Sequence, residues 1–338
     1  MPWPPRGSAV VDLRAGVIGL GVMGRNHARI LSRLPGVTLV GIVDPLEITG
    51  EHYGQLMRST AELLAKGVDY CFVAVPTELH EEVGLLLASS GVHALVEKPL
   101  AADVASATSV TKAFESAGLV GAVGHIERYN PALREARRRV EAGELGQIYQ
   151  IVTRRQGPFP ARIADVGVVK DLATHDIDLT SWIAQQPYVS VTARTAHRTG
   201  RAHEDLVIAV GQLASGLVTG HTVNWLSPFK ERRTVITGER GALVADTLTA
   251  DLTFNANGSV ESQWEDVALF RGVSEGDVVR FAIPKPEPLR SEHEAFRDAV
   301  LGVDSDIVTM REGLATVAVA EAILESASTG QTIALPES

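Results

Sequence analysis

Three glycines near the start of the chain have the spacing of a loop that binds a dinucleotide. They form the pattern G-x-G-x-x-G, directly after a short apolar run and directly before a helical pattern. The first glycine allows a tight turn, the second lets the backbone approach a pyrophosphate, and the third permits close packing of a helix whose N-terminus attracts negative charge. We therefore expect the cofactor to bind at Gly19, Gly21, Val22, Met23 and Gly24.

Asp44 stands at the distance from this loop that ribose binding requires. It follows the second apolar run, twenty residues after Gly24. A carboxylate at this place accepts hydrogen bonds from the adenosine ribose hydroxyls and repels a 2′-phosphate. We expect NAD rather than NADP, with a solvent-exposed aspartate as the alternative. Pro76 and Thr77 follow a later apolar run, where ligands of parallel sheets collect, and we expect both at the cofactor. Thr77 would serve equally well as a helix N-cap.

One lysine and one aspartate–histidine pair supply groups for acid–base chemistry. Lys98 stands in Glu97-Lys98-Pro99 after an apolar run, so we expect it at the carboxyl end of a parallel strand, beside an X-Pro bond that could be cis. Asp171 and His175 are four residues apart in a helical pattern and so share one face. Histidine ionises near working pH, which suits a general base. A capping acid and a hydrogen-bonded histidine would explain this pair equally well, and with no third ligand nearby in sequence we expect no metal.

The elements that must position these residues fall into two groups. Residues 14–125 alternate β-branched runs with helical patterns, which predicts a doubly wound parallel sheet. The expected strands are 16–19, 38–43, 70–75, 94–97 and 119–123, with a weaker one at 55–57. The expected helices are 23–34, 60–66, 79–90 and 103–117. We assign 14–128 to an NAD-binding Rossmann domain, preceded by a flexible N-terminus at 1–13.

After Asn130-Pro131 the rhythm changes to alternating strands, which predicts an antiparallel sheet with one face free to be covered. The expected strands are 147–155, 189–195, 206–213, 216–223, 233–237 and 242–246. The expected helices are 132–142, 170–184, 290–301 and 310–326, and the last two could pack back on the first domain. The proline-rich segment 283–288 can only be a connector. We assign 129–330 to a second domain.

Composition sets the outer limits. A chain of 338 residues suggests two domains, at roughly 150 residues each. The net charge of −10 would repel a phosphate backbone and anionic lipid, so we expect neither nucleic acid nor a membrane as partner. No apolar stretch reaches the ~20 residues of a membrane helix, no signal peptide is visible, and the single Cys71 cannot form an internal disulfide. We expect a cytoplasmic protein.

The three motifs in their order resemble those of the glucose–fructose oxidoreductase and inositol dehydrogenase family (Gfo/Idh/MocA). Segments 125–131 and 287–296 support the likeness, which covers residues 14 to about 330. It implies an α/β fold, with a Rossmann domain followed by an α+β domain that carries a large, mostly antiparallel open sheet. It also implies homo-oligomers, dimers or tetramers, formed through that sheet. The activity implied is hydride transfer between NAD and a secondary alcohol carbon of a sugar or cyclitol.

The resemblance further implies a role for each site residue. His175 would be the general base, Asp171 would orient it or the sugar hydroxyls, and Lys98 would steady the reacting oxygen. The roles of Lys98 and His175 could be exchanged. Glu97 and Arg128 are expected at the cofactor. The residues expected at the substrate are Tyr129, Arg154 and Asp178. Arg128 and Tyr129 are alternatively ordinary helix-start residues, and Asp178 is alternatively solvated.

The substrate is the least determined part. Segments 124–131 and 165–178 look most like the branch that oxidises the C3 hydroxyl of an aminosugar. Within it, the acidic net charge favours a polycationic aminoglycoside of an antibiotic pathway, whereas Arg154, Arg155 and Arg162 would suit the diphosphate of UDP-N-acetylglucosamine. An inositol-type dehydrogenase is a further alternative. A catalytically silent NAD-binding regulator is the alternative of another class.

Overall fold

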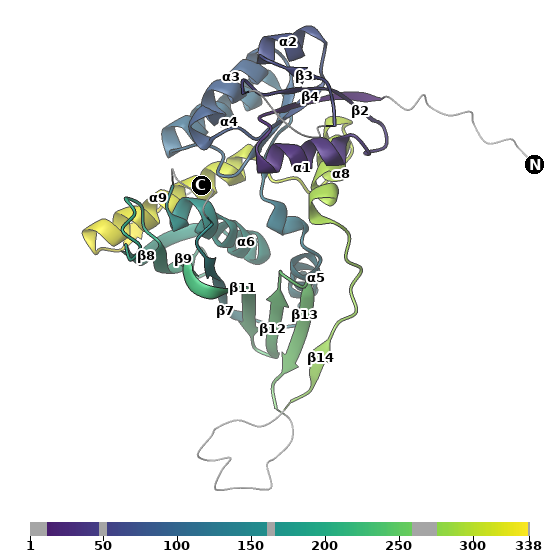
Figure 1. The fold of residues 1–338 in the computed structure, drawn as a ribbon. Coiled ribbons are helices and arrows are strands. Elements are labelled where there is room, and N and C mark those ends of the chain that lie inside the picture. The colour runs from purple at the N-terminus through teal and green to yellow at the C-terminus, as the bar shows by residue number, and fades with distance from the viewer. Residues whose placement is uncertain (1–11, 47–52, 161–165, 259–275, 337–338) are drawn as a thin grey trace, which may run out of the picture. The chain divides into compact units, whose positions relative to one another are not determined.

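A computed structural model of the chain describes residues 12–46, 53–160, 166–258 and 276–336. The chain divides into two compact units (Figure 1). The first comprises Met1–Gly124 with Leu289–Leu314, and the second comprises His125–Pro288 with Ala315–Ser338. Residues 1–11 of the expected flexible N-terminus, and Arg162, lie outside the described residues. In the described ranges, no helix is both long and apolar enough to cross a membrane.

The first unit is built on a six-stranded parallel sheet with the strand order β3-β2-β1-β4-β5-β6. The strands are β1 (Leu13–Ile18), β2 (Val37–Val43), β3 (Leu56–Met57), β4 (Tyr70–Val73), β5 (His93–Glu97) and β6 (Gly121–Gly124). The helical elements are α1 (Val22–Leu31), α2 (Thr60–Ala65), η1 (Thr77–Leu79), α3 (His80–Ser89), α4 (Val104–Ala117) and α8 (Pro288–Val300). Strand β4 is buried at every residue, as a parallel strand covered on both faces must be. The predicted Rossmann architecture is confirmed.

The second unit is built on a nine-stranded sheet with the order β14-β13-β12-β11-β7-β10-β9-β8-β15. The strands are β7 (Ile148–Pro158), β8 (Tyr188–Ala196), β9 (Leu206–Leu213), β10 (Val218–Asn224), β11 (Leu226–Gly238), β12 (Gly241–Asp246), β13 (Asp251–Ala256), β14 (Val278–Arg280) and β15 (Ile333–Ala334). All pairs are antiparallel except β7 with β10, which is parallel. The mostly antiparallel sheet is therefore confirmed. Sequence analysis missed β13, β14 and β15, because the last two are very short and β13 contains Asp and Asn, which disfavour strands.

One face of this sheet is covered by helices and the other is exposed. The covering elements are η2 (Ile126–Tyr129), α5 (Pro131–Glu141), η3 (Val169–Ala173), α6 (Thr174–Ala184) and the second half of α9 (Met310–Thr329). Ile151 and Val207 point into this core, whereas their neighbours Val152 and Ile208 are exposed, because successive strand residues face opposite sides. The segment between β14 and α8 forms neither helix nor strand, which confirms the proline-rich connector (Figure 1).

The helix expected at 170–184 begins differently from the prediction. Its first turn, η3, is a π-helix, and the α-helix α6 starts only at Thr174. The carboxylate of Glu204 accepts a hydrogen bond of 2.9 Å from the backbone N–H of Val169 and so caps this N-terminus. Gly167 leaves room for the cap, since a Cβ there would overlap the Glu204 carboxylate. Single π turns are frequent at functional positions in helices, and this one contains Asp171.

Candidate functional site

The glycine loop forms the N-terminus of α1 in the first unit. Gly19 has a φ of +92°, and a Cβ there would lie 2.5 Å from the carbonyl oxygen of Ala74. A Cβ at Gly24 would overlap the carbonyl oxygen of Gly19, so strand and helix pack closely at this point. A Cβ at Gly21 would meet no described atom within 4 Å. That position is therefore open, as the approach of a pyrophosphate requires.

The same helix end carries positive potential that no side chain in it offsets. Gly21 is the N-cap and makes no side-chain hydrogen bond, and the first turn of α1 contains no acidic residue. Val22 and Met23 begin the helix, so their N–H groups have no partner one turn earlier in it. The loop therefore fits the pyrophosphate of a dinucleotide.

Asp44 follows β2 and contacts the glycine loop. Its Oδ2 accepts a hydrogen bond of 2.7 Å from the N–H of Leu20, and its Oδ1 accepts one of 2.9 Å from the N–H of Leu46. Each carboxylate oxygen keeps a second lone pair for a ribose hydroxyl. The side chain is half-buried at the carboxyl end of its strand. Its place agrees with the ribose contact that the sequence predicts.

Pro76 and Thr77 stand after β4, where Pro76 is exposed and Thr77 begins η1. Thr77 does not act as a helix N-cap, because Pro76 occupies that position. The buried His80 contacts the carbonyl oxygen of Val75 at 3.0 Å and that of Pro99 at 2.9 Å. His80 thus connects the loop after β4 with the loop after β5, where Lys98 lies.

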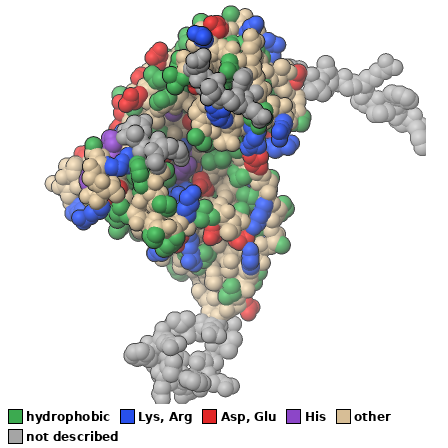
Figure 2. All heavy atoms as spheres, in the orientation of Figure 1, with side chains coloured by type: hydrophobic (Ala, Val, Ile, Leu, Met, Phe, Trp, Pro, Cys, Tyr) green, Lys and Arg blue, Asp and Glu red, His purple; other side chains and the backbone are tan. Residues whose placement is uncertain are grey.

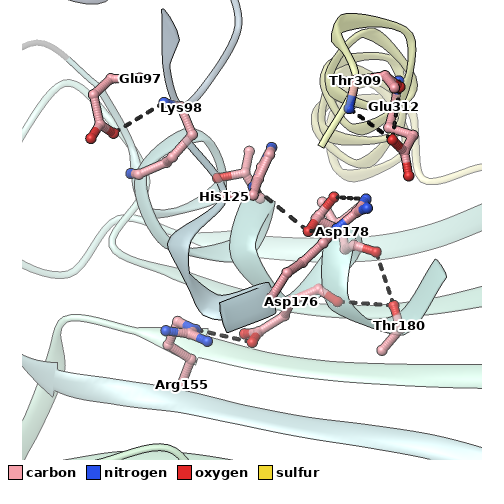
Figure 3. Close-up of polar contacts among 12 residues, drawn as sticks. Glu97, Lys98, His125, Arg155, Asp176, Asp178, Thr180, Thr309 and Glu312 are labelled. Carbon is pink, nitrogen blue, oxygen red and sulfur yellow. Dashed lines mark hydrogen bonds and ion pairs between the residues drawn. The ribbon is translucent and has the colours of Figure 1, made fainter. Parts of the chain in front are cut away.

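Lys98 directly follows β5, and the Lys98–Pro99 peptide bond is cis, as the sequence allowed. The Glu97 carboxylate accepts a hydrogen bond of 3.2 Å from the backbone N–H of Lys98 (Figure 3) and one of 2.8 Å from His27 Nε2. Burial alone would raise the pKa of Glu97, but His27 and the positive charge of Lys98 outweigh it and hold that pKa below its ordinary value. Glu97 is therefore an ionised group that anchors the main chain at Lys98.

Asp171 and His175 lie in the second unit, one turn apart across the junction of η3 and α6. Asp171 is buried and its N–H donates to the carbonyl oxygen of Gly167 at 3.1 Å, whereas His175 is half-buried. The rings of His125 and His175 stand edge to face, with 6.4 Å between their centroids. The helix thus presents a carboxylate and an imidazole together, which is the donor set of an acid–base site.

Two buried ion pairs hold α6 against the elements around it. Arg128 donates to both oxygens of Asp178, from Nε at 2.8 Å and from Nη2 at 2.5 Å. Nδ1 of His125 lies 3.9 Å from the same carboxylate. The cofactor role expected for Arg128 and the sugar contact expected for Asp178 thus fall on two side chains that bind each other. Their observed contact ties η2 to α6.

Arg155 forms the second ion pair. Its Nε lies 3.0 Å from Asp176 Oδ1 and its Nη1 lies 2.8 Å from Glu127 Oε1, so one guanidinium bridges α6 and η2 (Figure 3 shows the Asp176 contact). Burial raises the pKa of Asp176 although Arg155 opposes the rise. The neighbouring Arg154 is 58% exposed, against 4% for Arg155, and it lies on the opposite face of β7. The structure therefore does not bring Arg154 to Asp171 or His175.

The two units match two adjoining family models. Residues 13–125 match the NAD-binding Rossmann fold of an oxidoreductase family, and residues 133–244 match the GFO/IDH/MocA C-terminal domain. The chain belongs to the Gfo/Idh/MocA family. Its first unit is an NAD-binding Rossmann domain.

The chain is similar to several known sugar and inositol dehydrogenases. UDP-N-acetylglucosamine 3-dehydrogenase of Acidithiobacillus ferrooxidans is 34% identical over 54% of this chain and 58% of its own length. Its solved structure superposes with a TM-score of 0.82 at 25% identity, over 94% of this chain and 98% of that one. The scyllo-inositol 2-dehydrogenase (NAD(+)) of Bacillus subtilis is 30% identical over 54% of this chain and 56% of its own length. The chain thus matches little more than half the length of each of these two relatives in sequence.

A structure described as GenD2 from gentamicin A biosynthesis in complex with NAD shares the fold. Its TM-score is 0.80 at 24% identity, over 99% of this chain and the whole of that chain.

Tyr129, which the resemblance placed at the substrate, is buried beside Arg128, as a core residue is. Sequence reasoning did not connect His27 with Glu97, although His27 shares a helix face with the buried Gly24, Ile30 and Leu31, which signals an inward position. Arg155, which the sequence offered for a diphosphate, points inward as the alternation of β7 indicates, and it pairs there with Asp176 and Glu127. No local pattern marks Glu204, because its partner is 35 residues away.

Proposed function

We propose that this chain is an NAD-dependent dehydrogenase that oxidises a secondary hydroxyl of a sugar to a ketone, at C3 of a hexopyranosyl aminosugar. Two observations support the use of NAD as cofactor: the open glycine loop at the N-terminus of α1 and Asp44 beside it. The reaction and the carbon are supported by the UDP-N-acetylglucosamine 3-dehydrogenase that is 34% identical over 187 residues.

The observation that carries the proposal is the retention of three groups suited to alcohol oxidation. Lys98 is anchored at the end of β5 by an ionised Glu97. Asp171 and His175 are presented on one helix, which two ion pairs and the Glu204 cap hold in place. A regulator that only binds NAD has no need of these three side chains together. A non-catalytic NAD-binding regulator is therefore the second candidate function.

The chemistry follows from what each side chain can do. Oxidation of the alcohol releases a proton from the hydroxyl and a hydride from carbon. Bound NAD⁺ supplies the acceptor for the hydride. His175 removes the proton as general base, Asp171 orients His175 or the sugar hydroxyls, and Lys98 donates a hydrogen bond to the oxygen as negative charge develops there. An exchange of roles between Lys98 and His175 is the alternative assignment.

Three sugar classes are candidate substrates. The sequence relative favours a UDP-linked aminosugar. The net charge of −10 favours a polycationic aminoglycoside, which would place the enzyme ahead of a transamination in antibiotic biosynthesis. Inositols are the third class, supported by the 30% identical scyllo-inositol dehydrogenase.

The deciding experiment measures NADH formation with UDP-aminosugars, aminoglycosides and inositols, together with NADH consumption by the corresponding ketones. We expect turnover with one class, and a loss of on the order of 10²–10⁴-fold in Lys98→Ala and His175→Ala with NADH binding retained. Lys112→Ala, on α4, is the matched lysine control. Unchanged turnover in the Lys98 and His175 variants would refute the assignment, and NAD binding without turnover of any sugar would favour the regulator.

A further inference from the structure

Three hydrogen-bonded side chains, those of His293, His27 and Glu97, lead to the backbone of Lys98 in the first unit. His27 of α1 contacts Glu97 Oε1 through Nε2 at 2.8 Å, and its Nδ1 lies 2.8 Å from Nε2 of His293 on α8. Both imidazoles are fully buried. The His293 ring stacks on Phe72 with 3.9 Å between centroids, so its orientation is fixed by packing. The other Glu97 oxygen holds the backbone N–H of Lys98.

The direction of these hydrogen bonds follows from the chemistry of the two outer side chains, Glu97 and His293. An ionised carboxylate only accepts, so His27 donates to Glu97 from Nε2. In neutral His27 the other nitrogen is then bare and accepts from the Nε2–H of His293. Nδ1 of His293 is buried and makes no hydrogen bond within the described residues, which suits an unprotonated nitrogen better than a buried N–H. Burial also holds the pKa of His293 well below its ordinary value.

Glu292 is a second acid close to this group of side chains. It precedes His293 on α8, is 1% exposed, and neither of its oxygens has a hydrogen-bond partner in the described part of the chain. Burial, and then the negative charge of Glu97, raise the pKa of Glu292 well above its ordinary value. Of the two acids, Glu97 has donors that favour its ionised form, whereas Glu292 has no donor among the described residues, which favours its protonated form.

We propose that His27 and His293 are positioning residues for Lys98: the two-imidazole chain keeps the Glu97 carboxylate ionised and fixed on the main chain at Lys98. This inference rests on the proposed function in one respect, the role of Lys98. The other titratable groups that face the cluster are His80, through the charge of Glu97, Arg29, through that of His293, and Glu292.

The test uses paired substitutions that differ only in the donor. His293→Leu removes the N–H and keeps an apolar side chain beside Phe72, whereas His293→Gln retains an N–H donor. We expect the Glu97 carboxylate to protonate on the order of one pH unit higher in His293→Leu and near the wild-type pH in His293→Gln. The readout is an infrared titration of the buried carboxyl band, identified by its loss in Glu97→Gln. The same pair at His27 provides a second test where one variant fails to fold.

The pH profile of kcat tests whether His27 and His293 affect catalysis. The pH at which kcat falls on the acidic side should be higher in His293→Leu than in wild type, and close to the wild-type value in His293→Gln. Adding His293→Leu to Glu97→Gln should not change it further. Glu292→Gln is the matched control, because it replaces a neutral acid with a neutral amide. Equal protonation of Glu97 in His293→Leu and wild type, or equal shifts in the Leu and Gln variants, would overturn the proposal. Because the infrared titration needs no substrate, it decides the inference even if no sugar is turned over.

Discussion

At the residue scale, Asp44 holds the glycine loop and the turn after β2 through its two carboxylate oxygens. Its two hydrogen bonds to N–H groups use one lone pair on each oxygen, which leaves one lone pair on each oxygen for a ligand. These two bonds shape the loop, and we propose that the negative charge of the carboxylate discriminates between ribose hydroxyls and a 2′-phosphate.

We predict that Asp44→Ala lowers the preference for NAD over NADP by about 10- to 100-fold, the equivalent of about 1–3 kcal/mol. The measurement is kcat/KM, or the dissociation constant, for both cofactors. Asp12→Ala, at the opposite end of the first strands, is the control. A wild-type protein that prefers NADP would contradict the role given to this acid.

Glu292 leads to a prediction about stability. Its pKa is raised well above the ordinary 4.5, so between these values the folded protein holds a proton that the unfolded chain has released. Stability from this group is therefore full below pH 4.5 and falls as the pH rises, by about 1.4 kcal/mol per unit.

We predict that Glu292→Gln unfolds at a higher urea concentration than wild type at pH 7.5, and that the difference shrinks toward pH 4.5. Glu294→Gln, on the outer side of α8, should change stability by less than about 0.5 kcal/mol at either pH. A difference that is independent of pH would show that Glu292 is not protonated in the folded state.

At the scale of elements, Arg155 joins three parts of the second unit, namely β7, η2 and α6. The strand β7 supplies one guanidinium that bridges η2, through Glu127, and α6, through Asp176. Arg128 joins the same two elements through Asp178. The helix that carries His175 is thus held by charge pairs with specific geometry rather than by apolar packing alone, and apolar packing permits more sliding.

We predict that Arg155→Met destabilises the second unit by about 3–5 kcal/mol, because it leaves the buried Asp176 without its counter-ion. Arg154→Met, one residue away on the exposed face, should cost about 0–1 kcal/mol. Urea unfolding with the intrinsic tryptophan fluorescence of the second unit measures both. Similar effects of the two substitutions would show that the bridge does not organise the site.

At the scale of the whole molecule, the exposed face of the nine-stranded sheet is a candidate interaction surface. Its apolar side chains include Val152, Ile208, Val210 and Val218. Contiguous apolar surface of this kind marks interaction sites in soluble proteins. On the face seen in Figure 2, basic and acidic side chains are interspersed, so the charge of −10 is not gathered there into one acidic patch.

We predict that the chain forms homo-oligomers through this sheet and that Val210→Lys dissociates them. Light scattering after size exclusion gives the mass directly. Leu301→Lys, at an exposed apolar site on the first unit, is the control and should leave the mass unchanged. A monomeric wild type would refute the prediction, and an oligomer that survives Val210→Lys would place its interface elsewhere.

Much of this architecture could be inferred from spacing along the chain. The glycine loop, Asp44 and Lys98 each depend on a short segment that joins a strand to the next element, and such segments have few conformations. The Rossmann domain, strands β7 to β12 of the second sheet and the place of Asp171 and His175 on one helix face were therefore predictable. The residues that hold this machinery were not, because each bond depends on how distant elements pack. His27 meets a histidine 266 residues away, Arg128 meets Asp178 rather than an open site, and the two neighbouring arginines of β7 separate into a buried and an exposed one only once the sheet has a covered face.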